Sequence, residues 1–200
     1  MRKIVLASGN SGKLAEMRTI LAGFASDLVA QSDLDIADID ESGTTFVENA
    51  LLKARHAART SGLPALADDS GLCVDALDGA PGLLSARYAG PHGDAAANIA
   101  KLLDALRDVR APERGACFYC CAVLLRSATD PTPLIAEGCW EGSILEQPRG
   151  GRGFGYDPVF LDRESGLSAA ELDPAAKNRV SHRARALVCL RERLSAGAVA

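Results

Sequence analysis

Near its N-terminus the chain passes from a short apolar run into a polar loop, in the segment KIVLASGNSGKL at residues 3–14. The run from Lys3 to Ala7 is apolar and β-branched, which is typical of a buried strand. The loop from Ser8 to Gly12 holds two glycines, and apolar residues then recur with helical spacing from Leu14 to Leu21. A strand, a glycine loop and a helix in this order open an α/β unit.

The rest of the chain continues to mix predicted helices with predicted strands. Helical spacing and capping residues predict helices over 45–61 and 94–107, after Asp173-Pro174, and from Ser181 onward. Apolar runs predict strands that end near Val29 and that cover 63–67, 116–125 and 134–138, the last two as antiparallel neighbours. Helix-linked and hairpin-like strands together predict an α/β fold with a mixed sheet, in a single domain over residues 1–200.

Composition excludes several classes of protein. The 200 residues are 48% hydrophobic and 24% charged, as in an ordinary globular domain. A net charge of -4 and an aromatic content of 4% argue against a binder of polymeric nucleic acid, such as an RNA-binding module. No apolar run reaches membrane-spanning length, and the N-terminal run is too short for a secretion signal. We therefore expect a cytoplasmic protein without membrane contact.

The six cysteines include Cys117 and Cys120, which have the spacing of a metal-ligand pair. No second pair and no matching histidines accompany them, and positions three apart in a strand point to opposite faces. We interpret all six as reduced thiols that act as small core residues, rather than as a zinc site.

The loop from Ser8 to Lys13 has two interpretations. Glycines let backbone N–H groups approach an anion, and Lys13 adds a charge at the start of a helix, so the loop is a candidate phosphate site. It is not a Walker A loop, because Ala7 and Leu14 stand where that motif needs glycine and a hydroxyl residue. The alternative is a plain strand-to-helix turn with an exposed lysine.

Acidic residues form a second candidate site. Asp68 and Asp69 follow the predicted strand 63–67, and Asp40 and Glu41 lie in a loop before the helix that carries Lys53. Carboxylates from two segments suit Mg²⁺, which also keeps waters and substrate phosphates as ligands. Solvated acidic turns are the alternative.

Two further segments are candidates for a ligand pocket. Glycines flank an aromatic residue in GFGYDP at residues 153–158, which exposes backbone and ring together to a flat ligand, or else forms a turn packed by its own aromatics. Lys177 and the Ser181-His182-Arg183 segment place cations near a helix start. These cations either bind anions or carbonyl oxygens of a ligand, or are ordinary surface or capping residues.

Taken in order, these segments resemble one family, the inosine/xanthosine triphosphate pyrophosphatases that remove non-standard purine nucleotides, in its bacterial form. The resemblance runs from about residue 3 to about residue 190. It is carried by ASGNSGK at 7–13, TFVENALLKA at 45–54, ADDSGL at 67–72, GAPG at 79–82 with SARY at 85–88, GFGYDP at 153–158 and SHR at 181–183. Two positions depart from the usual pattern: Ser8 replaces threonine, and Asp40-Glu41 replaces a pair of glutamates.

The resemblance implies two lobes around a long mixed sheet with flanking helices, an active site in the cleft between the lobes, and a homodimer. It implies Mg²⁺-dependent hydrolysis of ITP, dITP or XTP to the monophosphate and pyrophosphate. It assigns catalysis to Asp69, Lys13 and Lys53, with Asp69 as general base, and metal binding to Asp69 with Asp40 or Glu41. The implied substrate contacts are Ser8, Gly9, Asn10, Ser11, Gly12, Lys13, Ser70, Phe154, Gly155, Tyr156, Asp157, Lys177, His182 and Arg183.

The residue types suit this chemistry. Cations and loop N–H groups neutralise charge on a leaving pyrophosphate, and a carboxylate orients or deprotonates water. Donors such as Lys177, His182 or Arg183 favour the 6-keto group of hypoxanthine and xanthine over the 6-amino group of adenine. Two alternatives are a septum-inhibitor-type pyrophosphatase for modified pyrimidines, which carries Ser-Pro-Arg-Arg in the first loop, and a nucleotide sensor without turnover.

Overall fold

The computed structural model describes residues 3–22, 27–90 and 93–195. Its strands form one six-stranded sheet in the order β2-β1-β3-β4-β5-β6. Their bounds are β1 Ile4–Leu6, β2 Leu28–Ala30, β3 Ala65–Val74, β4 Gly115–Leu125, β5 Leu134–Ile144 and β6 Phe160–Asp162. Strand β1 pairs in parallel with β2 and β3, whereas β5 pairs antiparallel with β6, so the predicted mixed sheet is confirmed.

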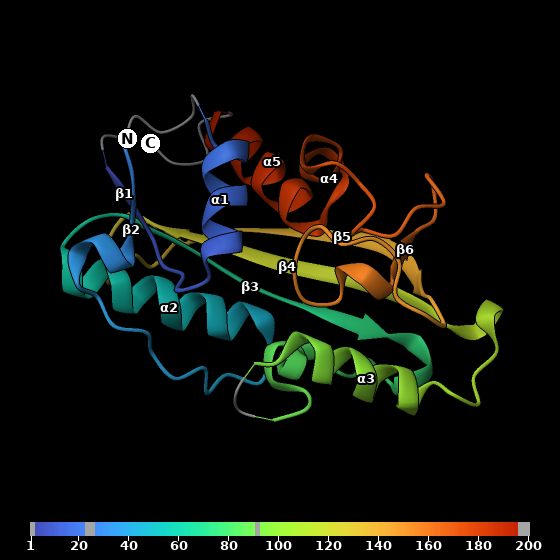
Figure 1. The fold of residues 1–200 in the computed structure, drawn as a ribbon. Helices are drawn as coiled ribbons and strands as arrows, with labels where there is room; N and C mark the ends of the chain where they lie inside the picture. The colour runs from blue at the N-terminus through green and yellow to red at the C-terminus, as the bar shows by residue number, and fades with distance from the viewer. Residues whose placement is uncertain (1–2, 23–26, 91–92, 196–200) are drawn as a thin grey trace. The chain divides into compact units, whose positions relative to one another are not determined.

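Five α-helices accompany the sheet in the described part of the chain (Figure 1). Their bounds are α1 Ser11–Ile20, α2 Phe46–Ser61, α3 Ala95–Ala105, α4 Pro174–Val180 and α5 His182–Ser195. Short 3-10 turns cover Gln31–Leu34, Asp75–Leu77, Gly82–Arg87, Ala111–Glu113 and Asp157–Val159. The α/β class predicted from the sequence is confirmed, and none of the described helices has the length and apolarity needed to cross a membrane.

Helix α2 shows why the sequence predicts its position closely. Thr45 caps the helix by accepting a hydrogen bond from the backbone N–H of Glu48, and Glu48 in return accepts from the N–H of Thr45. At the other end Gly62 adopts a left-handed φ of 68°, which ends the helix without strain. Between these caps, the small side chains of α2 are buried on one face.

The chain divides into two compact units that alternate along the sequence. Unit 1 comprises Met1–Asp69, Cys120–Gly138 and His182–Ala200, and unit 2 comprises Ser70–Tyr119 and Cys139–Ser181. Strands β3, β4 and β5 each contain one of the boundaries between these segments.

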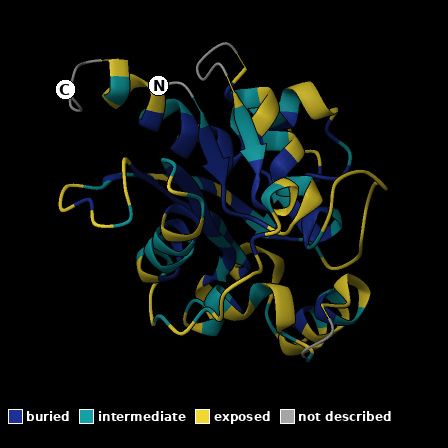
Figure 2. Ribbon diagram, turned by 90° about the vertical axis from the view of Figure 1, so that its left-hand side faces the viewer, coloured by how far each residue is buried: buried dark blue, intermediate teal, exposed yellow. Residues whose placement is uncertain are grey.

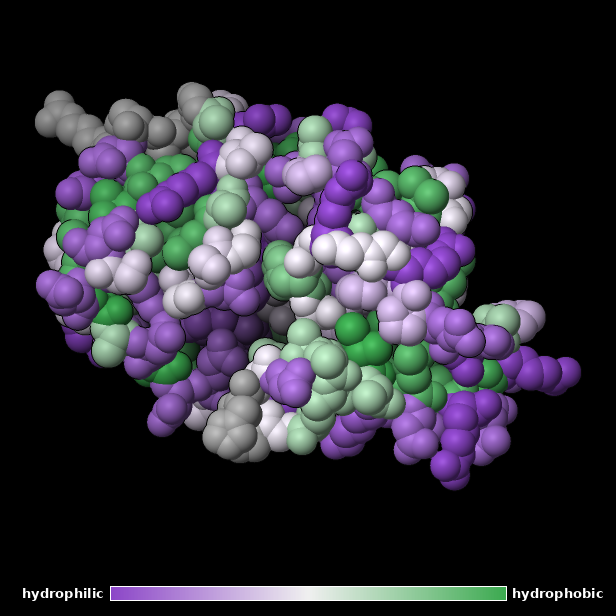
Figure 3. Space-filling view, viewed as in Figure 1, coloured by the Kyte–Doolittle hydropathy of each residue, from purple (hydrophilic) through white to green (hydrophobic). Residues whose placement is uncertain are grey.

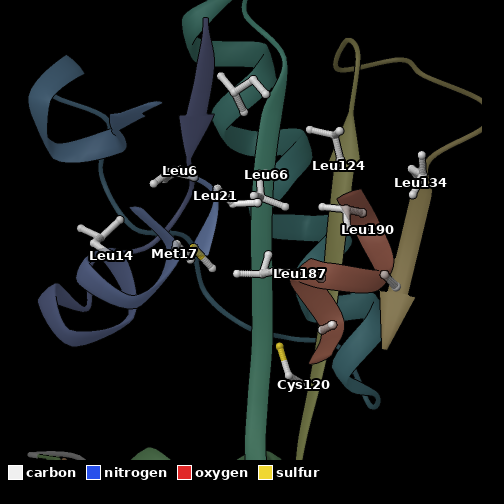
Figure 4. Packing of buried hydrophobic residues seen from close by; sticks show 14 of the residues in the cluster. Leu6, Leu14, Met17, Leu21, Leu66, Cys120, Leu124, Leu134, Leu187 and Leu190 are labelled. Atoms are coloured by element: carbon white, nitrogen blue, oxygen red, sulfur yellow. The ribbon is translucent and has the colours of Figure 1, made fainter. Parts of the chain in front are cut away.

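In unit 1, helices α1 and α5 lie on one face of the sheet and α2 on the other (Figure 1). Met17 and Leu21, which come from α1 and its C-terminal end, pack with Leu187 and Leu190 from α5 and with Leu66 from β3 (Figure 4). Gly138 on β5 allows α5 to approach closely, because a Cβ there would lie 2.5 Å from the backbone nitrogen of Ala186. This packing holds the N-terminal end of α1 beside the middle of β3.

Unit 2 has its own apolar core. Trp140 and Phe160 lie at its centre with ring centroids 5.0 Å apart, and Phe118 stacks on Trp140 and packs at a tilt against Phe160. The indole N–H of Trp140 donates to the buried Asp162 carboxylate at 2.9 Å. Figure 2 shows the strands as largely buried, with exposed positions gathered on loops and outer helix faces. On the face seen in Figure 3, hydrophilic residues are interspersed with smaller hydrophobic groups.

Two strands are longer than predicted. Strand β3 continues past Ala67 to Val74, so Asp68 and Asp69 lie within the strand and not after it. Strand β5 continues past Gly138 to Ile144. Because aspartate is uncommon in strands, the acidic pair predicts the end of a strand. Both carboxylates are instead buried and paired with cations, which removes the reason for the strand to stop.

Candidate active site

The loop after β1 is shaped by its own polar side chains. The hydroxyl of Ser8 accepts a hydrogen bond from the backbone N–H of Asn10 at 3.2 Å. Asn10 caps α1, its side-chain oxygen accepting from the backbone N–H of Lys13 at 3.0 Å. A Cβ on Gly9 would lie 2.6 Å from Asp38, so no larger residue fits there without movement. The loop therefore leads directly into a helix N-terminus, the geometry predicted for binding an anion.

Asp68 is the anchor of a buried charge network in unit 1. Its Oδ2 atom lies 3.2 Å from Lys13 Nζ and accepts two hydrogen bonds from the Arg183 guanidinium, at 3.1 and 3.2 Å. Arg183 also pairs with Glu16 of α1, and its side chain is 1% exposed. Strand β3, helix α1 and helix α5 are thus joined by one set of ion pairs.

Asp69, the next residue of β3, lies in a second network. Its two oxygens accept from Lys53 Nζ at 2.8 Å and from the Asn49 side-chain amide at 3.4 Å. Lys53 also donates to Glu41 at 2.9 Å. Asn49 and Lys53 are four residues apart on α2, so they reach Asp69 from one helix face. Successive side chains of a strand alternate, but the two networks remain electrostatically coupled, because Lys53 also acts on Asp68 and Lys13 also acts on Asp69.

The adjacent carboxylates have opposite electrostatic character. Burial acts to raise the pKa of Asp68, but Lys13, Arg183 and Lys53 together hold that pKa far below its ordinary value. Burial raises the pKa of Asp69 above its ordinary value, although Lys53 opposes that shift. Burial opposes the charged form of Lys53, but Asp68 and Asp69 raise the pKa of its ammonium overall. The charged form is therefore favoured at Asp68, whereas Asp69 is the more basic carboxylate.

The structure separates Asp40 from Glu41, the two acids between which the sequence does not choose. Glu41 is partly buried and shares Lys53 with Asp69, whereas Asp40 is exposed. Both carboxylates that contact Lys53 therefore converge on one point.

A third group of candidate residues lies in unit 2. Asp157 is buried, and its Oδ2 accepts from Lys177 Nζ at 2.6 Å and from the backbone N–H of Phe154 at 2.8 Å. Lys177 Nζ also lies 4.6 Å from the centroid of the Phe154 ring, which is 38% exposed. Gly153 and Gly155 have φ of 76° and 59°, left-handed values that favour glycine and let this tight loop form.

The other residues predicted to contact the substrate differ in burial and in the partners they contact. The hydroxyl of Tyr156 donates to the carbonyl of Ser85, which holds its ring in the core of unit 2. Ser70 is half-buried on β3, and His182 is buried at the start of α5. Arg183 lies against Asp68 and Glu16, so in this structure its donors are used within unit 1.

Sequence analysis did not place Glu16 and Asn49 at the site, and it named Asp68 only as one of the acidic candidates, without a role of its own. Helical spacing held part of the signal, because Glu16 lies three residues after Lys13 on α1 and Asn49 lies four residues before Lys53 on α2. Asp68 gave no such signal, since its partners come from helices distant in the sequence.

The prediction that all cysteines are reduced is wrong for two of them. Cys117 and Cys139, from neighbouring strands, form a disulfide. The alternative metal pair of Cys117 and Cys120 is not formed, because the Cys120 sulfur lies buried 3.8 Å from Asp68 Oδ2. A disulfide between strands depends on their register, which the spacing of cysteines does not reveal.

Known proteins are similar in sequence to this chain along nearly its whole length. A protein named dITP/XTP pyrophosphatase from Xanthomonas axonopodis pv. citri is 63% identical over 196 residues, 98% of each chain. Another of that name from Xylella fastidiosa is 60% identical over 192 residues, 96% of each chain. The solved structure of a HAM1 protein from Coxiella burnetii superposes with a TM-score of 0.90 at 49% identity, covering 98% of this chain and 100% of that one.

These findings confirm the resemblance to triphosphate pyrophosphatases inferred from the sequence motifs. The model of the Ham1 family matches residues 4–193, which include every candidate residue of both units. The chain belongs to the Ham1 family.

Proposed function

We propose that this protein hydrolyses non-standard purine nucleoside triphosphates, namely dITP, XTP and ITP, to the monophosphate and pyrophosphate. The observation that carries the proposal is the pair of charge networks on β3, beside a phosphate-type loop. They occur in a chain that is 60–63% identical to proteins named dITP/XTP pyrophosphatase. Removal of such nucleotides from the pool is the biological role that we infer.

The triphosphate is bound by unit 1. The loop from Ser8 to Lys13 offers backbone N–H groups at the start of α1, where the helix dipole favours an anion. Lys13 and Lys53 supply full charges, and each already contacts a β3 carboxylate that fixes its direction. Their task is to neutralise the charge that grows on the leaving pyrophosphate.

The composition of the networks favours a divalent cation. Glu16, Glu41, Asp68 and Asp69 supply four carboxylates, whereas Lys13, Lys53 and Arg183 supply three cations. A triphosphate brings further negative charge, so its binding requires additional positive charge. Within the described residues, Asp68 Oδ1 is a buried oxygen without a hydrogen-bond donor, a further sign that the donor set accommodates a cation or its water.

Asp69 and Glu41 are the residues that would hold Mg²⁺, because both carboxylates converge on Lys53 Nζ. When bound, Mg²⁺ supplies charge neutralisation on phosphate oxygens and lowers the barrier to attack at phosphorus. Asp69 orients the attacking water and accepts its proton, a role for which its raised pKa suits it better than Asp68. Lys53 and Asn49 keep the Asp69 carboxylate in place through its two oxygens.

The base is selected by unit 2. The exposed ring of Phe154 offers a stacking surface, and Lys177 stands beside that ring as a donor held by Asp157. A donor favours the 6-keto oxygen of hypoxanthine and xanthine and faces another donor in adenine. On the family resemblance we also propose that the protein is a cytoplasmic homodimer.

The proposal is tested by a substrate screen. Purified protein is supplied with dITP, XTP, ITP, the four ordinary dNTPs and a modified pyrimidine triphosphate, and pyrophosphate is resolved from phosphate. We expect pyrophosphate from the three non-standard purines, loss of its release on chelation, and recovery on addition of Mg²⁺. Phosphate as the product, or preference for the pyrimidine, would refute the proposal.

A further inference from the structure

Unit 2 carries a group of potential soft-metal ligands that the hydrolytic chemistry does not use. Cys117 lies on β4 and Cys139 on the neighbouring strand β5, and their Cα atoms are 6.2 Å apart in the disulfide. Glu141 lies two residues beyond Cys139, so both side chains project from the same face of β5. Glu141 Oε1 lies 3.3 Å from the Cys139 sulfur.

The face that carries these side chains is open to solvent. Along β5 buried positions alternate with positions that are half-buried or exposed, and Cys139 and Glu141 belong to the second set. Cys117 on β4 is likewise half-buried. A reductant and a hydrated metal ion can therefore reach the disulfide, in contrast to Cys120, which is fully enclosed.

The ligand atoms are already close enough to share one ion. The two sulfurs and one carboxylate oxygen all lie within 4.8 Å of one another. Opening the disulfide yields two thiols beside a carboxylate, and ionised together they would be three mutually repelling anions. Thiolate and carboxylate ligands suit Zn²⁺, which binds three protein ligands and a water in open sites.

We propose that reduction of the Cys117–Cys139 disulfide creates a zinc-type site held by Cys117, Cys139 and Glu141. An external dithiol donates two electrons and two protons: the S–S bond breaks, two thiols form, and the dithiol becomes its own disulfide. Binding of the cation then releases the two thiol protons to solvent. The disulfide form of the dithiol reverses the sequence as the oxidant: it accepts two electrons from the Cys117 and Cys139 thiolates and two protons from solvent and becomes the dithiol, while the S–S bond forms again and the ion is released.

The other four cysteines supply matched controls. Cys73, Cys120, Cys121 and Cys189 are free thiols. Burial raises the pKa of Cys121 to about 11, with nearby carboxylates adding to the shift, so that thiol resists ionisation and metal binding. Cys73 is half-buried like Cys117, which makes Cys73→Ser the appropriate control for the loss of one thiol.

The test uses Co²⁺ as a spectroscopic probe of the zinc-type site. Thiol titration under denaturing conditions is expected to give four thiols in oxidised protein and six after reduction with a phosphine. Reduced protein, freed of phosphine without air, is expected to bind one Co²⁺ with a thiolate-to-cobalt absorption band, which Zn²⁺ abolishes. Oxidised protein is expected to show no such band.

Variants locate the ligands. Cys117→Ser and Cys139→Ser are each expected to remove the band, Glu141→Gln to weaken Co²⁺ binding by about tenfold or more, and Cys73→Ser to leave both unchanged. Six thiols in the oxidised protein, no band after reduction, or a band that survives in both cysteine variants would overturn the proposal. Release of pyrophosphate from dITP is expected to be the same in Cys117→Ser as in the parent, so this test stands apart from the proposed hydrolysis.

Discussion

The charged groups of unit 1 and unit 2 are built differently. In unit 1, Asp68 and Asp69 each belong to a network with several partners, and the networks draw on helices α1, α2 and α5 and on the loop that carries Glu41. In unit 2 the buried pair of Asp157 and Lys177 stands beside a glycine-rich loop and the exposed ring of Phe154. The unit 1 networks contain more carboxylates than cations, together with several cations, which suits a reaction in which charge moves between phosphate oxygens. One fixed donor beside a ring suits recognition of a neutral base.

This difference predicts different consequences for substitutions in the two units. Changes to the unit 1 networks should lower hydrolysis of every substrate together, or destabilise the fold. Changes to the unit 2 pair should alter the preference between substrates.

The largest effect is expected from Asp69→Asn. The amide has nearly the same shape but accepts no proton and carries no charge, so we expect kcat for dITP to fall by about 100-fold or more. Burial raises the pKa of Asp69, so at pH values above the ordinary pKa of aspartate the charged carboxylate destabilises the folded state. The neutral amide avoids this cost and should not lower the Tm. Steady-state kinetics and a thermal melt check both expectations, with Asp40→Asn as the exposed control.

If Asp69→Asn kept more than about a tenth of the parent kcat, the activation barrier would have changed by less than ~1.4 kcal/mol. Asp69 would then not be the general base.

Asp68→Asn is expected to act mainly on stability. It leaves Arg183 and Lys13 facing a neutral group in a buried site, which typically costs about 3–5 kcal/mol in the free energy of unfolding. The pKa of Asp68 is depressed in the folded state, so its contribution is present above the ordinary carboxylate pKa and is lost as pH falls toward the folded value. Urea unfolding at neutral and at acidic pH should show the gap between parent and variant narrowing on acidification.

Asp104→Asn is the control for Asp68→Asn, because its carboxylate belongs to an exposed pair with Arg107. A loss of stability in Asp68→Asn no greater than in this control would contradict the anchoring role.

Lys13→Ala and Lys53→Ala are expected to have intermediate effects. Each removes a cation that we place on the leaving pyrophosphate, and we expect kcat/KM for dITP to fall by about 10- to 100-fold. Lys101→Ala, which removes an exposed lysine of unit 2, should leave kcat/KM unchanged. If either of the first two variants behaved like Lys101→Ala, that lysine would not contact the triphosphate.

The smallest effect on activity is expected from Lys177→Met, and it concerns selectivity. Because the variant also removes the cation that pairs with the buried Asp157, some loss of stability is expected beside it. Loss of the donor should lower the ratio of kcat/KM for ITP to that for ATP by about tenfold, since a charge-assisted hydrogen bond is lost with the keto base alone. Arg179→Ala, an exposed cation on the same helix α4, is the control. Equal losses on ITP and ATP would instead assign Lys177 to holding Asp157.

Arg183→Ala sharpens the same comparison. The sequence resemblance implies that Arg183 contacts the nucleotide, and its donor chemistry suits a keto base. In the structure its guanidinium is buried on Asp68 and Glu16, so we expect a loss of stability and equal losses on ITP and ATP. A selective loss on ITP would show that Arg183 leaves these partners to read the base.

Local signals account for what the sequence predicted well. Caps and helical spacing placed α2 nearly to the residue, because Thr45, Glu48 and Gly62 interact with their own neighbours. The strand character of Asp68 and Asp69 was not predictable in this way. Arg183, a partner of Asp68, lies 115 residues away, and no local pattern reveals that a distant cation compensates a buried acid. The choice between Asp40 and Glu41 and the Cys117–Cys139 bond depend likewise on loop path and strand register.

The most direct test follows the oxygen atom of the attacking water. If Lys13, Lys53 and the loop N–H groups neutralise a leaving pyrophosphate, water attacks the α-phosphorus. Hydrolysis of dITP in ¹⁸O-labelled water is therefore predicted to give labelled dIMP and unlabelled pyrophosphate, measured by mass spectrometry of both products. Label in the pyrophosphate, or formation of dIDP with phosphate, would contradict the account.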